Sequence, residues 1–215
     1  MTKSVFIGVC GGSGSGKSYL ARALAESFMP GVATTIGLDA YYWPKEKVPE
    51  QIRGNYDHPD ALEGQLIAEH LKLWRKGDIV YMPQYDFARH DRHPDTVTLA
   101  ATPVMIIDSF LLFSLPMVVE QLSFAVFVDA PADVRLARRL ARDVRERGRS
   151  VDDILEHYFA TVRPMHEQFV EPHKNTADLV VCSTQPLEHE LAQVLPAVLE
   201  RFPVLEKRLK PKTAV

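Results

Sequence analysis

The sequence predicts a single α/β domain in which a mostly parallel sheet lies between two layers of helices. Short apolar runs of strand length alternate with longer segments of helical period, which is typical of parallel strands joined by crossover helices. A glycine-rich loop at residues 11–18 lies between the first apolar run and the first helical segment, as in the three-layer P-loop NTPase fold. We expect one domain over residues 1–215, with a small β-rich substrate flap near 78–100 and an Arg-rich helical lid near 135–160.

The first half of the chain contains two predicted strands and two predicted helices. Residues 5–9 form a buried strand, and residues 34–38 form a second strand that ends at Asp39. The charged stretch at 44–55 is predicted to be a loop. The first helix follows the glycine loop, and the second begins with Pro59 in its first turn and stops at Gly77. Their core positions repeat at helical spacing: Leu20, Ala23, Leu24 and Phe28, then Leu62, Leu66, Ile67, Leu71 and Trp74.

The second half adds the flap, three more strands and the lid. Residues 78–99 contain Pro83 and Pro94, which suits short strands outside the main sheet. Further strands are expected at 104–107 and 124–128, helices at 132–144 and 151–171, and the last strand at 179–182. A terminal helix follows, and Pro196 should kink or interrupt it.

The composition is that of an ordinary globular protein. The 215 residues are 46% hydrophobic and 25% charged, with a net charge of -3, so there is no bulk basic character for nucleic-acid binding. Cys10 and Cys182 lie in or beside apolar runs and are predicted to be buried thiols in a reducing compartment. There is no signal-peptide segment and no apolar run of membrane-spanning length. We expect a cytoplasmic protein without nucleic-acid or membrane partners.

The glycine loop matches G-x-x-x-x-G-K-S and predicts an ATP site. Glycines let backbone amides close around phosphate oxygens, Lys17 adds a positive charge, and Ser18 offers a hydroxyl to Mg²⁺. A dinucleotide site is disfavoured, because the spacing is G-x-G-x-G rather than G-x-G-x-x-G and a Lys-Ser pair has no role there. The predicted ATP-binding residues are Gly11, Gly12, Ser13, Gly14, Ser15, Gly16, Lys17, Ser18 and Tyr19.

Two acids end predicted strands near this loop. Asp39 and Asp108 each follow an apolar run, where a carboxylate can reach phosphate, magnesium or an attacking hydroxyl. Each alone could simply end its strand in solvent, but the pair beside a P-loop points to phosphoryl transfer. We assign Asp39 as the catalytic base and Asp108 to the metal shell, with Ser18 and Asp39 as further metal-binding candidates for Mg²⁺ bound with ATP.

The expected lid is rich in arginine. Between positions 135 and 149 there is no lysine, and guanidinium forks suit bidentate contacts to phosphate. A solvated helix paired with Asp133, Asp143 and Glu146 is the alternative, and a nucleic-acid surface is disfavoured because the cluster is local. The arginines are Arg135, Arg138, Arg139, Arg142, Arg145, Arg147 and Arg149.

Two rings and a histidine occur in the flap segment. Tyr85, Phe87 and His90 do not follow a core period, and such side chains can stack on a planar base and hydrogen-bond its edge. From these residues alone, ordinary β packing is the simpler explanation.

Several motifs, in order and spacing, are similar to those of the uridine kinase (uridine-cytidine kinase) family. The chain resembles that family over nearly its whole length. The matching segments are 38–42 (LDAYY), 55–61 (NYDHPDA), 83–87 (PQYDF) with His90, 127–129 (FVD), 138–139 (RR), 142–143 (RD), 146–149 (ERGR) and 162–165 (VRPM).

The resemblance implies roles for individual residues. Asp39 matches the acid that activates the nucleoside 5′-hydroxyl, and Asp57 matches the acid that holds the ribose hydroxyls. Tyr85, Phe87 and His90 match the pyrimidine pocket. Arg139 and His157 match ribose-contacting positions, and Arg149 matches a contact on the base side. Arg142 and Arg147 match lid positions that serve substrate and phosphates, and with Lys17 they are implied in catalysis. Tyr42 is a further implied substrate-binding residue.

Three positions depart from the family pattern. Asp108-Ser109 replaces a usual Glu-Gly, so the carboxylate is one methylene shorter. His157 replaces a usual ribose-binding glutamine, and residues 182–186 (CSTQP) replace a Pro-Arg-Gly type segment.

The activity that the resemblance implies is ATP-dependent phosphorylation of the 5′-hydroxyl of uridine or cytidine to UMP or CMP, in pyrimidine salvage, by a homotetramer. The departures leave two alternatives: a related kinase of the phosphoribulokinase type or for another nucleoside, and a catalytically weak nucleotide-binding regulator. A GTPase switch is disfavoured because no Asn-Lys-x-Asp guanine motif occurs.

Overall fold

The computed structural model describes residues 4–87 and 89–211; Ala88 in the flap and both ends of the expected domain lie outside the described residues. Its centre is a five-stranded sheet with the strand order β2-β7-β1-β8-β9. All of its neighbouring strands pair in parallel, which confirms the predicted parallel sheet. The strands are β1 (Val5–Cys10), β2 (Ala33–Gly37), β7 (Val104–Asp108), β8 (Phe124–Asp129) and β9 (Leu179–Cys182).

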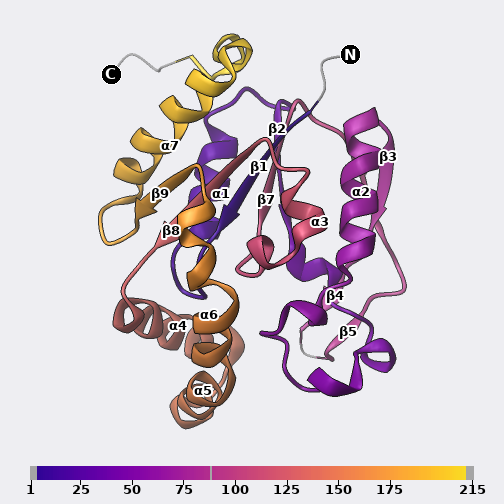
Figure 1. The fold of residues 1–215 in the computed structure, drawn as a ribbon, viewed down its shortest axis with the longest axis vertical. Helices are drawn as coiled ribbons and strands as arrows, with labels where there is room; N and C mark the ends of the chain where they lie inside the picture. The colour runs from indigo at the N-terminus through magenta and orange to yellow at the C-terminus, as the bar shows by residue number, and fades with distance from the viewer. Residues whose placement is uncertain (1–3, 88, 212–215) are drawn as a thin grey trace.

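Helices cover both faces of this sheet, which makes the three predicted layers (Figure 1). Alternate residues of β1 point to opposite faces: Phe6 joins the core under α2 (Gly64–Lys76) and α3 (Pro116–Val119), and Ile7 joins the core under α1 (Lys17–Glu26) and α7 (Leu187–Arg201). Burial on both faces explains why the three central strands, β7, β1 and β8, are continuous apolar runs rather than alternating ones.

The segment 78–100 forms short antiparallel strands outside the main sheet, as predicted. β3 (Ile79–Met82) pairs with β6 (Val97–Ala100), and β4 (Tyr85–Asp86) pairs with β5 (Asp91–Arg92). The β3–β6 hairpin packs along α2, where the indole of Trp74 donates a 3.0 Å hydrogen bond to the Leu99 carbonyl. The β4–β5 hairpin lies at the carboxyl edge of the sheet instead (Figure 1).

The Arg-rich segment is helical and lies across from β4–β5 in Figure 1. It consists of α4 (Ala132–Arg147), α5 (Val151–His157), a π-helical turn (Tyr158–Val162) and α6 (Arg163–Phe169). Gly148 ends α4 in the left-handed region with φ 62°, a conformation that glycine adopts without strain. The predicted helices at 132–144 and 151–171 are thus confirmed, with a π turn inside the second.

One helix prediction needs correction. Pro59 begins a separate 3-10 helix, and α2 starts only at Gly64, because Leu62 is extended and forms a β-bridge with Tyr42. Gly77 ends α2 as predicted, in the left-handed region. Pro196 lies inside α7 without interrupting it. The short 3-10 helices are Leu38–Tyr41, Lys45–Lys47, Glu50–Ile52, Pro59–Ala61, Leu112–Ser114, Glu171–Thr176 and Pro203–Arg208.

The prediction of two buried thiols is half wrong. Cys10 is buried, but Cys182 is exposed. Cys182 ends β9, an edge strand in which Val181 faces the core, and successive side chains of a strand point to opposite faces. Within the described part of the chain, none of the helices has the length and apolar character needed to cross a bilayer.

Candidate active site

The glycine loop leads directly into α1. Lys17 is the first residue of that helix, and Gly16 precedes it with φ 96°. Gly14 also has a positive φ, and a Cβ there would clash with the carbonyl oxygen of Arg135 in α4. The loop therefore requires glycine both for its backbone and for its close contact with the lid, and it directs amides and Lys17 toward one space.

Asp39 and Asp108 lie together at the carboxyl edge of the sheet. Asp108 ends β7 and is in register with Val9 of β1 and Gly37 of β2, so Asp39, two residues beyond Gly37, follows the neighbouring strand. Burial raises the pKa of Asp39; the charge of Lys17 opposes this rise and that of Asp108 adds to it. The structure thus brings Asp39 into the electrostatic range of both Lys17 and Asp108.

The residues at this edge fit a magnesium ion bound with ATP. Asp108 Oδ1 is buried and has no hydrogen-bond partner among the described residues, so it is available as a ligand. Ser18 lies in the first turn of α1, beside Lys17. In residues 4–87 and 89–211 no three His, Cys, Asp or Glu side chains gather as a metal site. Mg²⁺ usually takes one or two carboxylates together with waters and substrate phosphates, and the unpartnered oxygen of Asp108 could serve as one of these ligands.

Asp108 and Ser109, which depart from the family pattern, begin a turn that is held by two hydrogen bonds of Ser109. The amide of Ser109 donates to the Val9 carbonyl at 3.3 Å, and its Oγ accepts from the Leu111 amide at 3.2 Å. The next ring, Phe110, lies 6.0 Å from Lys17 Nζ. The serine side chain therefore holds the turn after Asp108 and directs an aromatic face toward the P-loop lysine.

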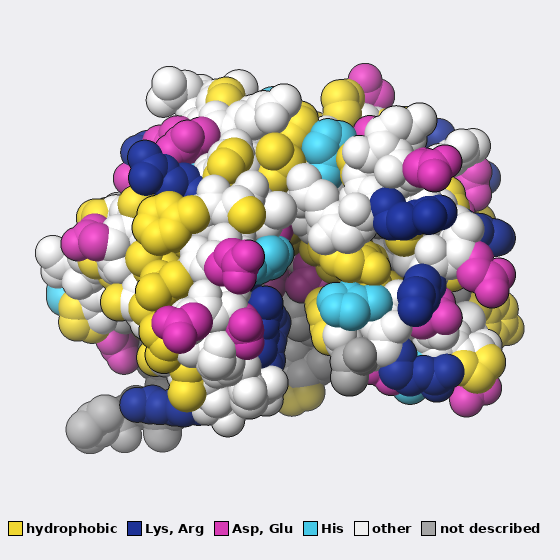
Figure 2. Space-filling view, turned by 90° about the horizontal axis from the view of Figure 1, so that it is seen from below, with side chains coloured by type: hydrophobic (Ala, Val, Ile, Leu, Met, Phe, Trp, Pro, Cys, Tyr) yellow, Lys and Arg dark blue, Asp and Glu magenta, His cyan; other side chains and the backbone are white. Residues whose placement is uncertain are grey.

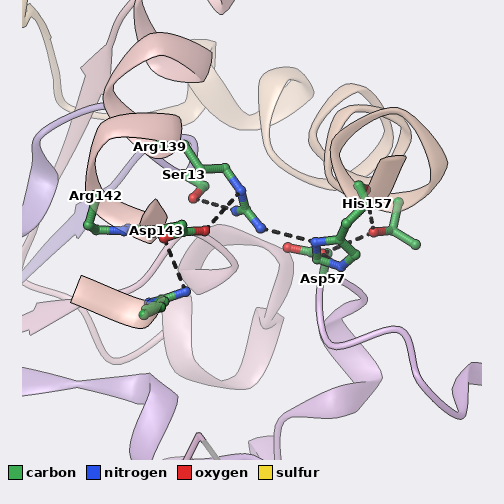
Figure 3. Close-up of polar contacts among 8 residues, drawn as sticks. Ser13, Asp57, Arg139, Arg142, Asp143 and His157 are labelled. Carbon is green, nitrogen blue, oxygen red and sulfur yellow. Dashed lines mark hydrogen bonds and ion pairs between the residues drawn. The ribbon is translucent and has the colours of Figure 1, made fainter. Parts of the chain in front are cut away.

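Asp143 is the centre of the lid. Its side chain is 0% exposed, and it pairs with Arg142 Nε at 2.8 Å, Arg147 Nη1 at 3.5 Å and Arg139 Nε at 3.6 Å (Figure 3). The sequence analysis named Asp143 in a matching segment and as an ion-pair partner on a solvated helix, but gave it no role in the site. Arg135 and Arg139 are in fact buried, because this face of α4 packs toward the P-loop.

A polar chain connects the P-loop to the predicted ribose-binding acid. Arg139 donates to Ser13 Oγ at 2.9 Å and bonds His157 Nδ1 at 3.1 Å, while His157 Nε2 lies 3.4 Å from Asp57 Oδ2 (Figure 3). Burial lowers the pKa of His157, and the charge of Asp57 only partly opposes this. Neutral His157 can accept from Arg139 and donate to Asp57, so it orients both side chains that the resemblance assigns to ribose.

The predicted base-binding residues belong to one aromatic cluster. Tyr42 contacts Tyr85 at 5.2 Å between centroids, Tyr85 contacts Phe87 at 5.4 Å, and His90 stacks on Tyr56 at 4.7 Å. Tyr56, which also contacts Tyr42, is the member that sequence reasoning missed. Its signal was present, because it stands beside Asp57 in a matching segment.

The lid and the flap meet across the site. The Arg147 guanidinium lies 5.7 Å from the centroid of Phe87, which is 49% exposed. From below, a hollow separates the two sides, and histidine side chains lie on both (Figure 2). On the lid side is a recess of about 410 Å³, lined by Arg149, Asp153, Glu156, His157 and Ala160. Asp153 and Glu156 were not among the site residues predicted from the sequence.

Arg92 is a second residue that sequence reasoning missed. Its Nε donates to the Tyr42 carbonyl at 2.8 Å, its Nη2 to the Tyr41 carbonyl at 2.9 Å, and its Nη1 pairs with Glu63 at 2.6 Å. This fork ties β5 to the turn that follows Asp39. By contrast, Tyr19 of the predicted ATP-binding set is 62% exposed and lies beside Arg22, on the outer side of α1.

Comparisons with known proteins show the family to which the chain is similar. The model of the phosphoribulokinase / uridine kinase family matches residues 6–188. A uridine kinase from Clostridium botulinum (strain 657 / Type Ba4) is 40% identical over 183 residues, which cover 84% of this chain and 89% of that protein.

Solved structures show the same fold at low identity. D-glycerate 3-kinase from Cryptococcus neoformans has a TM-score of 0.63 at 15% identity, covering 85% of this chain and 87% of that one. Phosphoribulokinase from Rhodobacter spheroides has a TM-score of 0.60 at 12% identity, covering 87% and 75%. With the family match over most of its length, the chain belongs to the phosphoribulokinase / uridine kinase family.

Proposed function

We propose that this protein transfers the γ-phosphoryl group of ATP to the 5′-hydroxyl of uridine or cytidine, and so acts in pyrimidine salvage. The 40% identity to a uridine kinase over 84% of the chain carries the proposal. The geometry supports it, because one edge of the sheet holds a P-loop, a candidate base at Asp39, a candidate ribose-binding acid at Asp57 and an aromatic cluster with the size and rings to hold a pyrimidine.

In this proposal Asp39 accepts the proton of the 5′-hydroxyl as its oxygen attacks the γ-phosphorus. The bond between that phosphorus and the β,γ-bridging oxygen breaks, and ADP leaves with the electron pair. A raised pKa brings the Asp39 carboxylate nearer the working pH of a base. Lys17, Arg142 and Arg147 neutralise charge on the phosphoryl oxygens, which is the main protein contribution in phosphoryl transfer.

Asp57 and its neighbours would position the acceptor. Asp57 is fixed by His157 and by the Thr161 hydroxyl, which lies 3.4 Å from its Oδ2, so its other oxygen is oriented to accept from a ribose hydroxyl. We assign Tyr42, Tyr85, Phe87 and His90 to the base, and Arg139 and Arg149 to the sugar and the base side. Such positioning reduces the entropy cost of aligning the 5′-oxygen with phosphorus.

The donor site would use the P-loop amides, Lys17 and Ser18 for ATP. Asp108, Ser18 and Asp39 are the residues that would hold Mg²⁺, which supplies charge neutralisation of the phosphates when bound. The family resemblance further suggests a homotetramer in the cytoplasm; light scattering on the purified protein measures its mass.

A coupled ADP-release assay tests the activity. The acceptors are uridine, cytidine, purine nucleosides and ribulose 5-phosphate, each with ATP and Mg²⁺. We expect turnover with the pyrimidine nucleosides. Folded protein that binds ATP without pyrimidine-dependent ADP release contradicts the proposal and favours the regulator, whereas turnover restricted to ribulose 5-phosphate favours the phosphoribulokinase-type alternative.

A further inference from the structure

Asp143 occupies an unusual position for an acid on an Arg-rich helix. It is the acid in α4 that is completely buried, and three arginines of the lid surround it. Burial alone would raise its pKa, but the hydrogen bond from Arg142 and the charges of Arg142, Arg147 and Arg139 lower it below its usual value. Asp143 is thus a buried anion that depends on these three cations.

The atoms that pair with Asp143 determine where the guanidinium forks point. Arg142 bonds Asp143 through Nε at 2.8 Å, and Arg139 also approaches through Nε, at 3.6 Å. The terminal nitrogens of Arg139 then bond Ser13 and His157. For Arg142, the described residues give no other hydrogen-bond partner, so its terminal nitrogens are left for another acceptor. A fork held through one edge presents its other edge in a fixed direction.

Arg142 and Arg147 also lie near the proposed base, Asp39. The charges of Arg147 and Arg142 partly oppose the rise that burial causes in the pKa of Asp39, so the two guanidinium groups lie within electrostatic range of the proposed base. Arg147 is paired with Asp143 at 3.5 Å and contacts Phe87 of the flap. Asp143 therefore pairs with two arginines that lie near Asp39, and one of them, Arg147, also reaches the flap.

We propose that Asp143 is a positioning residue for phosphoryl transfer, which holds Arg142 and Arg147 in the orientation in which they meet the transferred phosphoryl group. The inference rests on the proposed function of those arginines. Asp143 itself touches neither substrate. Its contribution is to preorganise positive charge, which costs no rearrangement when the transition state forms.

The test compares Asp143→Asn with Glu146→Gln in the coupled assay with ATP and uridine. Glu146 is an exposed acid on the same helix, so its change removes the same charge without touching the buried cluster. We expect Asp143→Asn to lower kcat about 100-fold, as misaligned catalytic groups do, with the KM for ATP nearly unchanged. The Glu146→Gln variant should retain wild-type values.

A double-mutant cycle separates positioning from a merely structural role. If Asp143 acts through Arg142, then Arg142→Ala combined with Asp143→Asn is about as slow as the slower single variant. Independent effects, in which the two fold-losses multiply, would overturn the proposal, as would full activity of a folded Asp143→Asn variant.

A further variant covers the case in which Asp143→Asn does not fold. Asp143→Glu keeps the charge but moves the carboxylate by one methylene, and unfolding temperature and binding of a fluorescent ATP analogue report its integrity. Lowered kcat with intact ATP binding supports the proposal; wild-type kcat overturns it. If the wild-type protein prefers another acceptor, the proposed function is wrong. The ratios of variant to wild-type kcat, measured with that acceptor, still decide the role of Asp143.

Discussion

Asp39 shows how the surroundings of one side chain tune its chemistry. Burial raises its pKa, Lys17 opposes the rise, and Asp108 adds to it. An ionised carboxylate in this position is costly to bury but is a stronger base than an exposed aspartate. Removing this carboxylate should therefore lower catalytic activity without lowering the free energy of unfolding.

We predict that Asp39→Asn lowers kcat about 1000-fold, because the amide cannot accept the hydroxyl proton. Binding of a fluorescent ATP analogue should be unchanged, and the free energy of unfolding should not fall. The matched control is Asp129→Asn, since Asp129 also ends a strand of the sheet but pairs with Lys174 at 2.7 Å. An Asp39→Asn variant with more than a tenth of wild-type activity would show that Asp39 is not the base.

The two cysteines differ in reactivity because they differ in environment. Burial raises the pKa of Cys10 to about 11, whereas a hydrogen bond with Thr184 lowers the pKa of the exposed Cys182. Since the thiolate is the reactive form, a disulfide reagent such as DTNB should label native protein at Cys182 first. Cys182→Ser should abolish this fast phase and Cys10→Ser should leave it; rapid labelling of Cys182→Ser would contradict the burial of Cys10.

Between elements, the main connection of the flap to the sheet edge is the fork of Arg92. It joins β5 to the carbonyls of Tyr41 and Tyr42, so the aromatic hairpin and the segment after Asp39 are held as one unit. The third nitrogen pairs with Glu63, just before α2. A lysine has a single ammonium and cannot satisfy three acceptors in one plane.

We predict that Arg92→Lys lowers kcat/KM for the nucleoside by roughly 10- to 100-fold through misplacement of the hairpin and the Asp39 segment. ATP binding should change little. Arg89→Lys, in the same hairpin, is the control, because Arg89 is exposed. If both variants behave alike in steady-state kinetics, the Arg92 fork has no positioning role.

For the molecule as a whole, the site is a junction of distant segments. The P-loop, the strand ends, the flap and the lid come from all parts of the chain between Gly11 and Thr161, and the Arg147–Phe87 contact joins lid to flap. The terminal helix α7 adds a buried acid behind the lid: Glu190 has its Oε2 buried without a partner among the described residues.

The stability of the whole fold should depend on pH through Glu190. Burial raises its pKa to about 7, only partly opposed by Arg138. The unfolded chain releases this proton near pH 4.5, so between about 4.5 and 7 the folded state binds more protons and stability falls as pH rises. Glu190→Gln should therefore be more stable than wild type at pH 8, by roughly 2–3 kcal/mol, and equal to it near pH 4.

Urea unfolding at both pH values measures this difference. Glu188→Gln is the control, because Glu188 lies in the same first turn of α7 but is exposed. A Glu190→Gln variant whose advantage does not grow between pH 4 and pH 8 would mean that Glu190 is ionised in the folded protein.

Local sequence determined the elements and the chemical groups at their ends. Short apolar runs without alternation, set between segments of helical period, are typical of strands buried on both faces. The P-loop, which contains Lys17, follows one such run directly, and Asp39 and Asp108 follow two others. The motif resemblance indicated the kinase family, which the comparisons confirm.

Tertiary structure decided which side chains are buried and which distant groups they contact. Asp143 is one of several acids on an Arg-rich helix until α4 packs on the P-loop and buries it, and Arg92 is one charge in a polar hairpin until β5 meets Tyr41 and Tyr42. Likewise, Cys182 is exposed because of its place on the edge strand β9, and Leu62 is extended because it forms a β-bridge with Tyr42. Sequence period specifies a face of one element. Contacts between distant elements, such as Arg92 with Tyr41 and Arg139 with Ser13, depend on how the elements pack, and that information is not local.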